Sequence, residues 1–456
     1  MSKSPRPSRR DFLVGSAASA AALGALSIAR TAHAAGSDLL KVALIGCGGR
    51  GTGAAVQALS TAGPVKLWAM ADAFEDRLQL SLEAIGKGQS GRYDTQAHEG
   101  FAEKVDVPPE RRFVGLEAYK QAIDSGADVV IFAEPPGFRP SHFEYAVQAG
   151  KHVFMEKPLA TDAPGVRQIL AANQVAKQKN LKVGVGLQRH HQPEYLETVK
   201  RIQDGAIGKL VLLRCYWNTG NPAKKPPQRE GLTEMQYQLR DWYFFTWLSG
   251  DHICEQHIHN IDVCNWIMNA HPVEANGMGG RQVRTGKDFG HIFDHHFVEF
   301  TYADGTKMYS QCRQIPGCWN SVTEHAHGTG GYANVSDFKI EATGREPWSL
   351  KKESRKARRG QAAPGSNPYQ IEHDVLFDAI RNNKPHNEVE YAAHSTMTAI
   401  LGRMATYSGK VVAWDEAFQS QLSLFPERLA WDAAPKILPD ADGVYPVAMP
   451  GSTKAW

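Results

Sequence analysis

A short apolar run followed by a glycine-rich turn constrains the fold of this chain more than any other feature. Lys41–Ile45 has the composition of a buried strand, and Gly46-Cys47-Gly48-Gly49-Arg50-Gly51 follows it directly. The G-x-G-x-x-G order predicts the start of a dinucleotide-binding fold, in which the glycines allow a tight turn, a close approach of the backbone to a pyrophosphate and close helix packing. The helix expected from about Thr52 to Ser60 would present its free N–H groups to the phosphates. We therefore expect the cofactor-binding turn to comprise Gly46, Gly48, Gly49, Arg50 and Gly51.

A second strand supplies the expected partner of this turn. The apolar run Val65–Ala71 ends at Asp72, which lies 21 residues after Gly51. A ribose-binding carboxylate is expected about 20 residues after the turn. Because an aspartate accepts hydrogen bonds from a 2′-hydroxyl and repels a 2′-phosphate, the pattern favours NAD over NADP. The alternative is an ordinary aspartate that caps a turn at a strand end.

Residues 1–34 have the features of an export signal. Ser8-Arg9-Arg10-Asp11-Phe12-Leu13 precedes an Ala-rich apolar run from Val14 to Ile28, and Ala32-His33-Ala34 has the small-x-small order of a cleavage site. The segment resembles a twin-arginine signal, which implies folding with the cofactor before export by the twin-arginine machinery to the periplasm or beyond. The apolar run is too short and too rich in alanine to favour stable membrane insertion, and an uncleaved anchor is the alternative.

Composition fits a globular enzyme and gives no indication of a nucleic-acid or membrane partner. The chain has 456 residues, of which 42% are hydrophobic and 22% charged, enough for two domains with cores. The net charge of +3 gives no argument for binding nucleic acid or a membrane. Six cysteines are scattered without a C-x-x-C pair, and Cys312 and Cys318 are either bridged or free, with free thiols expected after folding in a reducing cytosol.

Strands and helices alternate in the first part of the chain and not in the second. Predicted strands are Lys41–Ile45, Val65–Ala71, Ala127–Ala133, His152–Met155 and Lys182–Val185, with helices over Leu116–Asp124, Ser141–Ala149 and Ala163–Lys177 between them. Val211–Asn218, Phe297–Tyr302 and Thr306–Arg313 are typical of antiparallel strands, and a helix is expected from about Asp251 to Met268. The pattern predicts an α/β protein with a doubly wound parallel sheet and a second α+β domain with a large open, mostly antiparallel sheet, a common surface for self-association.

These patterns divide the chain into four parts. We expect the signal at 1–34, an NAD-binding Rossmann domain at 35–186, a substrate-binding and oligomerisation domain at 187–434, and a tail at 435–456 that wraps a partner. Asn221–Gly231 is irregular, and the basic run Lys351–Arg359 indicates either a solvated loop or a contact with an anionic glycan or another subunit.

Two segments carry residues suited to acid–base chemistry. Lys157 lies at the carboxyl end of a predicted strand, where an open parallel sheet faces its ligand crevice, so partial burial there would lower its pKa toward the range useful for proton transfer. The alternative is an ordinary surface lysine at a strand end. In the second segment, a continuous helix would place His252, Glu255, His259 and Asp262 on one face. Glu255 would then orient His259 as a general base for a sugar hydroxyl.

Zinc binding is the rival interpretation of the second segment. His252, Glu255 and His259, together with Asp294, His295 or His296, could assemble a zinc site, but the spacing matches no standard zinc helix. His257 lies on a different helix face from His259, which disfavours a chelate by that pair. We expect no metal. Histidines with purely structural hydrogen bonds are the third interpretation.

Taken together, these motifs resemble the Gfo/Idh/MocA family of sugar and inositol oxidoreductases. The resemblance rests on the glycine turn, Asp72, Ala133-Glu134-Pro135-Pro136, Glu156-Lys157-Pro158 and Glu255-x-x-x-His259, and it runs from about Lys41 through Trp414-Asp415-Glu416. It implies that Pro135, Glu156 and Lys157 contact the cofactor and that Lys157 and His259 flank the substrate hydroxyl. It also implies that Gln188, Arg189 and Tyr195 line the interdomain cleft, and that the protein is a homodimer or homotetramer. Two residues depart from the family pattern, since Glu255 replaces a common aspartate and Glu134 a common threonine or serine.

An exported NAD enzyme has no obvious pool of cofactor to exchange with, so the cofactor is expected to stay bound and to be recycled. The favoured reaction is oxidation and reduction of a sugar, cyclitol or glycoside hydroxyl by hydride transfer. An alternative is NAD-dependent glycoside hydrolysis by oxidation, elimination and reduction, in which His257, His190 or Tyr195 removes a carbon-bound proton. A second alternative is a sugar-binding protein without catalytic activity.

Overall fold

The computed structural model describes residues 38–89, 100–220, 227–350 and 367–456. The predicted export signal at 1–34, the Lys351–Arg359 run and residues 221–226 of the irregular Asn221–Gly231 stretch lie outside the described residues.

The first sheet has six parallel strands in the order β3-β2-β1-β4-β5-β6. The strands are β1 (Leu40–Ile45), β2 (Val65–Asp72), β3 (Arg112–Val114), β4 (Val129–Phe132), β5 (His152–Met155) and β6 (Val183–Val185). The five predicted strands are confirmed with small shifts at their ends. β3 was missed, because it is an edge strand of three residues with no buried side chain. The strand order reverses between β1 and β4, which is where a doubly wound sheet opens a ligand crevice.

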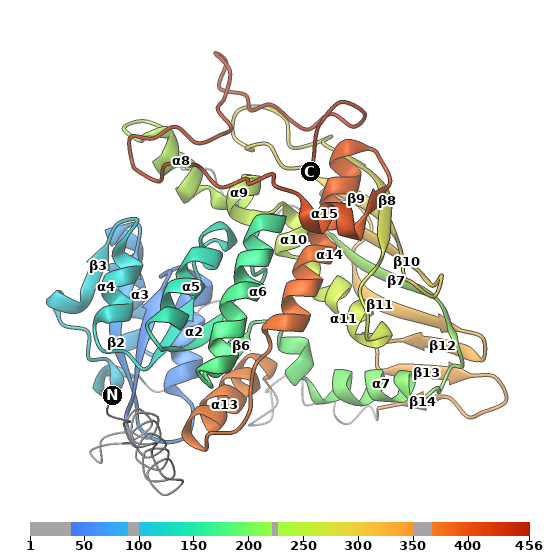
Figure 1. Ribbon diagram of the computed structural model, residues 1–456, viewed down its shortest axis with the longest axis horizontal. Helices are drawn as coiled ribbons and strands as arrows, with labels where there is room; N and C mark the ends of the chain where they lie inside the picture. The colour runs from blue at the N-terminus through green and yellow to red at the C-terminus, as the bar shows by residue number, and fades with distance from the viewer. Residues whose placement is uncertain (1–37, 90–99, 221–226, 351–366) are drawn as a thin grey trace, which may run out of the picture. The chain divides into compact units, whose positions relative to one another are not determined.

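Helices cover both faces of this sheet (Figure 1). They are α2 (Gly49–Leu59), α3 (Glu75–Gly86), α4 (Ala118–Asp124), α5 (Arg139–Gln148) and α6 (Ala163–Gln178). The side chains of α4, α5 and α6 share one apolar core. On the other face, α2 and α3 share a second core with α13 (Pro368–Arg381), which returns to the first sheet from late in the sequence.

The second sheet has nine strands in the order β14-β13-β12-β11-β7-β10-β9-β8-β15. The strands are β7 (Leu210–Thr219), β8 (Glu274–Gly280), β9 (His295–Thr301), β10 (Lys307–Gln314), β11 (Ser321–Gly328), β12 (Gly331–Asn334), β13 (Lys339–Ala342), β14 (Trp348–Ser349) and β15 (Val412–Ala413). Among the described ladders of this second sheet only β7 and β10 pair in parallel, so the predicted antiparallel character is confirmed for the sheet but is wrong for that pair. The predicted fold class is confirmed.

One face of the second sheet is packed and the other is open. Buried and partly exposed residues alternate along β9 and β10, as expected for a sheet with one covered face. The covered face packs on α11 (Ile258–Met268) and α14 (Val389–Ser408). Nearly every residue of α14 is buried, because this helix lies between α6 of the first domain and strands β8 and β9 of the second.

The helix predicted from Asp251 to Met268 is interrupted. The structure has α10 (His252–Glu255), a turn at Gln256 and His257, and then α11. Two contacts with β10 hold the turn: the Gln314 amide donates to Gln256 Oε1 at 2.7 Å, and His257 Nε2 lies 2.7 Å from Ser310 Oγ. The break changes which residues share a face, so the predicted face of His252, Glu255, His259 and Asp262 does not form.

The remaining elements are short helices outside the two sheets. They are η2 (Ala102–Lys104), η3 (Pro109–Arg111), η4 (Pro136–Phe138), η5 (Gln188–His191), α7 (Pro193–Gln203), α8 (Glu234–Arg240), η6 (Trp242–Phe244), α9 (Thr246–Ser249) and α15 (Trp414–Gln419). The tail after Pro435 has no helix or strand, and it packs on its own chain. Tyr445 is buried and donates its hydroxyl to Glu234 of α8, and Trp456 donates to Glu416 of α15 at 2.6 Å.

Two further properties bear on the sequence expectations. Within the described ranges, no helix combines the length and the apolar character that crossing a bilayer requires. Cys312 is buried and Cys318 exposed, and both are free thiols.

Candidate functional site

The glycine turn joins β1 to α2, and its glycines have two kinds of surroundings. Gly46 has a φ of +90°, and a Cβ there would lie 2.3 Å from the backbone nitrogen of Glu134. A Cβ on Gly51 would lie 1.9 Å from the Gly46 carbonyl oxygen. In contrast, a Cβ on Gly48 or Gly49 would meet no atom within 4 Å, and both residues line a cavity. The turn is therefore closed toward the protein and open toward the cavity, as a phosphate-binding turn requires.

Asp72 ends β2 beside this turn. Its Oδ2 accepts the Cys47 N–H at 2.7 Å and its Oδ1 accepts the Phe74 N–H at 2.9 Å. Burial raises the pKa of this carboxyl group, although the two backbone donors oppose the shift. The carboxylate is thereby fixed at the rim of the cavity, where a ribose hydroxyl would meet it.

The cavity has a volume of about 580 Å³ and lies at the carboxyl ends of the first sheet, with walls from both domains. Twelve of the residues proposed from the sequence line it: Gly46, Gly48, Gly49, Arg50, Asp72, Pro135, Glu156, Lys157, Gln188, Arg189, Glu255 and His259. Among the described residues, Arg50 Nη1, Gln188 Oε1 and His259 Nδ1 are buried without a hydrogen-bond partner. An open phosphate turn, a ribose carboxylate and unpaired polar atoms in one cavity fit a bound dinucleotide.

Glu156 positions the side chain of Arg50, which belongs to the glycine turn. Arg50 Nε lies 2.6 Å from Glu156 Oε1, and its Nη2 donates to Gln57 at 2.6 Å. Its guanidinium carbon lies 5.2 Å from the centre of the Tyr369 ring, and Tyr369 accepts a hydrogen bond from Gln188 at 3.0 Å. The pairing holds a cation at the cavity wall, where it would offset phosphate charge.

Glu134 brings a carboxylate close to the turn, and Arg139 and His142 lie beside it. Its Oε1 lies 3.8 Å from Arg139 Nε and 3.5 Å from His142 Nδ1. Arg139 is almost fully buried and also donates to the backbone carbonyl of Glu134 at 2.5 Å. The departure of Glu134 from the family pattern is therefore matched by a buried arginine from α5.

Lys157 and His259 both line the cavity, but Glu255 contacts the lysine. Lys157 Nζ donates to Glu255 Oε1 at 3.0 Å and also to the Glu255 backbone carbonyl. The predicted hydrogen bond between Glu255 and His259 is absent, because the turn after α10 breaks the helical spacing that would have brought them together. Glu255 is thus a partner of Lys157 in this structure.

His259 is held from the second domain. Its ring stacks on Trp217 at 5.9 Å, and its backbone carbonyl accepts a hydrogen bond from Arg189 at 3.0 Å. Burial, reinforced by the charges of Lys157 and Arg189, holds the pKa of its imidazole well below the usual value. His259 is therefore neutral at physiological pH and can accept a hydrogen bond.

Two residues expected to contact substrate are placed elsewhere. His257 is fully buried against β7 and β10, where its Nε2 lies 3.7 Å from Cys215 Sγ in addition to its contact with Ser310. Tyr195 is buried and donates to Glu324 at 2.9 Å. Neither residue lines the cavity. The helix break turns His257 toward the sheet, and the hydrogen bond to the buried Glu324 holds Tyr195 in the core. Gly51 likewise lies behind the turn, where it packs against Gly46.

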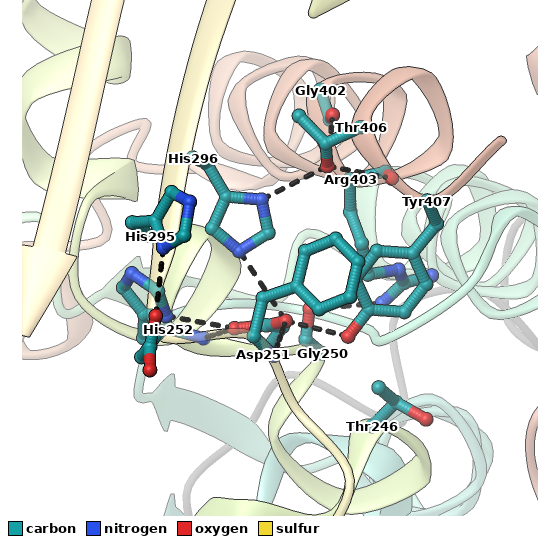
Figure 2. Close-up of polar contacts among 12 residues, drawn as sticks. Thr246, Gly250, Asp251, His252, His295, His296, Gly402, Arg403, Thr406 and Tyr407 are labelled. Atoms are coloured by element: carbon teal, nitrogen blue, oxygen red, sulfur yellow. Dashed lines mark hydrogen bonds and ion pairs between the residues drawn. The ribbon is translucent and has the colours of Figure 1, made fainter. Parts of the chain in front are cut away.

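Of the residues grouped by the zinc hypothesis, the structure brings His252 and His296 together. They meet around Asp251, a residue that the sequence hypothesis left out (Figure 2). The Asp251 carboxylate lies 2.9 Å from His252 Nδ1 and 3.3 Å from His296 Nε2, and it accepts the Tyr407 hydroxyl at 2.6 Å. With its oxygens already occupied, the Asp251 carboxylate acts as a buried anchor that ties α10 to β9 and α14.

Several cavity residues were not identified from the sequence. They are Phe74, Arg77, Leu116, Tyr119, Trp217, Leu239, Arg240, Trp242, Gln256 and Tyr369. Most come from segments of the second domain or from loops of the first, and no short motif marks them. Only those next to Asp72 had a positional clue, since the loop after that strand borders the ribose.

Family models match two consecutive parts of the chain. The model described as "Oxidoreductase family, NAD-binding Rossmann fold" (GFO_IDH_MocA) matches residues 40–187, and the "GFO/IDH/MocA C-terminal domain" model matches residues 195–333. Inositol 2-dehydrogenase of Serratia proteamaculans is 30% identical over 201 residues, which are 42% of this chain and 52% of that protein. The chain spans about half or less of the length of the curated relatives it matches first.

Solved structures share the fold over most of the described chain. Levoglucosan dehydrogenase in complex with NADH and levoglucosan covers 82% of this chain and 99% of its own, with a TM-score of 0.62 and 16% identity. Scyllo-inositol dehydrogenase from Lactobacillus casei with bound NAD(H) and scyllo-inositol covers 83% of this chain and 100% of its own, with a TM-score of 0.59 and 19% identity. At these identities the likeness is one of fold.

Proposed function

The chain belongs to the Gfo/Idh/MocA family of oxidoreductases, and from that premise we propose that it transfers hydride between a carbohydrate ring hydroxyl and NAD. The substrate class is a sugar, cyclitol or glycoside. One observation carries the proposal: Lys157 from the first domain and His259 from the second line the same cavity as the glycine turn and Asp72.

The side chains at this end of the cavity suit the oxidation of an alcohol. NAD, when bound, supplies the hydride acceptor. The alcohol must also lose its hydroxyl proton, and the neutral imidazole of His259, which lines the cavity, is able to accept it. Lys157, held by Glu255, supplies a second polar contact that orients the substrate oxygen. The depressed pKa of His259 means that its protonated form is short-lived, so the proton would pass on to solvent or to a neighbouring group.

The walls around this pair suit a polyhydroxylated ring. Trp217 and Trp242 offer flat apolar surfaces for the C–H faces of a ring, while Gln188, Arg189 and Gln256 offer polar groups for its hydroxyls. The named activities of the relatives, inositol 2-dehydrogenase among them, support this class of substrate.

We further propose that the protein is exported with NAD bound and recycles it in place. The twin-arginine-like signal at 1–34 supports export to the periplasm. We also propose a homodimer or homotetramer formed through the open face of the second sheet, where Met278 of β8 is exposed and where Trp319 is exposed in the loop before β11.

Hydrolysis by oxidation, elimination and reduction remains a second route, favoured by the same signal because it returns the cofactor to its starting state. It needs a base for a carbon-bound proton. Of the three candidates, His257 and Tyr195 are buried elsewhere and His190 bonds to Asp262 at 2.8 Å. The arrangement therefore supports the dehydrogenase over the hydrolase and over a binding protein without catalytic activity.

The test is a substrate screen on the purified protein loaded with NAD. NADH absorbance that reaches about one equivalent per protein with a sugar or cyclitol supports the dehydrogenase with retained cofactor. Sugar release from a glycoside without net NADH, with solvent deuterium at the carbon beside the oxidised one, supports the hydrolase. Failure to bind NAD on reconstitution would refute both.

A further inference from the structure

Two distant segments meet over the end of the cavity that lies away from Lys157 and His259. Arg240, the last residue of α8, donates hydrogen bonds from its two terminal nitrogens to the Asp76 carboxylate at 3.1 and 3.0 Å. Its guanidinium carbon also lies 4.0 Å from the centre of the Phe74 ring. Phe74 lies in the short loop after Asp72 and Asp76 in the first turn of α3, so this contact joins the second domain to the segment beside the ribose position.

A third segment adds an aromatic ring to this contact. Trp431, from the chain after α15, lies 5.5 Å from the Phe74 ring. Earlier in that segment, Leu424 donates its N–H to Asp162, at the start of α6, at 2.7 Å. The ring of Phe425 packs edge-on against Phe138 of η4, with 5.4 Å between the ring centres. The segment that carries Trp431 is therefore fixed to the first domain.

Helix α8 is fixed independently, so that Arg240 is held in place. A capping box of Thr233 and Gln236 starts the helix. Gln238 donates to the Ile437 carbonyl at 2.8 Å, and the chain after α15 runs alongside α8 and α9 (Figure 1). Side chains of α8, this late segment and the loop after β2 form one apolar cluster, separate from the two apolar cores that cover the faces of the first sheet.

The position of this cluster identifies what it covers. Phe74, Leu116 and Tyr119 line the cavity on the side of Asp72, and Leu239 and Arg240 face them from the second domain. In a Rossmann domain the carboxylate that ends the second strand binds the adenosine ribose, so the adenine lies at this end. We propose that Phe74, Asp76, Arg240 and Trp431 form a clasp that encloses the adenosine half of bound NAD and slows its release. The inference rests on the proposed use of NAD and assigns to these residues the retention of that cofactor.

The clasp acts by contacts that must separate before the adenosine half can leave. The side chains of Arg240 and Asp76 are 26% and 51% exposed, so solvent screens the ion pair. An exposed bidentate pair and a cation–π contact together account for about a tenfold change in the dissociation rate. The aromatic packing of Trp431 on Phe74 adds a similar contribution.

The test measures the release of NADH from the loaded protein. The purified protein is saturated with NADH and chased with excess NAD, and the loss of bound NADH fluorescence gives the dissociation rate. Arg240→Ala should raise the rate about tenfold, and Asp76→Ala should raise it less, because the cation–π contact of Arg240 with Phe74 remains. The double variant should raise the rate no further than Arg240→Ala alone, because the arginine substitution already removes the ion pair. Trp431→Leu should also raise the dissociation rate, because it removes the ring contact with Phe74, which does not depend on charge.

Controls separate the clasp from general effects. Arg428→Ala removes an exposed ion pair with Asp432 in the same late segment and should leave the rate unchanged. The affinity for ADP-ribose should fall in the clasp variants, whereas that for reduced nicotinamide mononucleotide, which lacks adenosine, should not change. An unchanged dissociation rate in Arg240→Ala, with NADH still bound by the parent protein, would overturn the clasp alone. Absence of NADH binding by the parent protein would overturn the clasp together with the proposed function.

Discussion

The glycine turn offers a paired test, because two of its glycines serve different purposes in the structure. A Cβ on Gly51 would lie 1.9 Å from the Gly46 carbonyl oxygen, which is backbone and cannot move without distorting the turn. A Cβ on Gly48 would meet no protein atom within 4 Å and would project into space that we assign to the pyrophosphate. Gly51→Ala should therefore damage the fold, and Gly48→Ala should damage cofactor binding.

The magnitudes differ enough to separate the two effects. Overpacking of the kind expected at Gly51 costs about 1–3 kcal/mol of the free energy of unfolding. At Gly48 the backbone is extended with a φ of −76°, so alanine fits and the cost is that of an alanine N-cap, about 1 kcal/mol or less. The added methyl group should remove one charge-assisted hydrogen bond to the pyrophosphate, about 1.5–3 kcal/mol, which corresponds to a rise of about 10- to 100-fold in the Kd for NADH.

Denaturant unfolding and NADH titration by fluorescence measure the two quantities. We expect Gly48→Ala to unfold near the parent midpoint and to bind NADH weakly, and Gly51→Ala to unfold at a lower denaturant concentration. Parent-like affinity for NADH in Gly48→Ala would refute the assignment of this turn to the pyrophosphate. Parent-like stability in Gly51→Ala would refute the packing argument.

Three further outcomes follow from named residues. Asp72→Asn removes the charge that repels a 2′-phosphate, so the preference for NADH over NADPH should narrow by about tenfold, and an unchanged ratio of the two Kd values would contradict the ribose assignment. Lys157→Ala should lose NADH formation with the substrate found in the screen by at least about 100-fold while the Kd for NADH stays near the parent value, and full activity would remove Lys157 from the reaction. Burial lowers the pKa of His252 and of His291 to about 4, so both are neutral at pH 7 in the folded protein. The unfolded chain takes up these protons below about pH 6.5 and the folded protein only below about pH 4, so the free energy of unfolding should fall across that window by roughly 3 kcal/mol per histidine. Chemical denaturation at pH 7 and pH 5 checks this, and equal stability at both values would be inconsistent with buried neutral histidines.

Much of the first domain could be predicted because its signals are local. A buried parallel strand is a continuous apolar run, and a phosphate-binding turn requires glycines at fixed spacing, so β1, the turn and Asp72 stand out in a few residues. The elements that escaped prediction have weak local patterns. β3 has three residues and no buried side chain, and α14 is buried on all sides and therefore has no periodic apolar face.

The candidate site was predictable in its residues and less so in its contacts. Lys157 and His259 were both assigned from the sequence, and both line the cavity. Their partners were not, because Glu255 bonds to Lys157 only after the chain turns at Gln256, and contacts with β10 hold that turn. Helical spacing cannot anticipate a break imposed by another strand.

The sequence by itself determined the Rossmann turn, the preference for NAD and the family, since these depend on residue types at short and fixed spacing. Only the tertiary structure decided that His257 and Tyr195 face the core, that Glu255 serves Lys157, and that Arg240 reaches Asp76 from 164 positions away. Each of these contacts joins segments far apart in the chain, and their meeting is set by how the two domains and the late segment pack together. A local pattern carries no information about that packing.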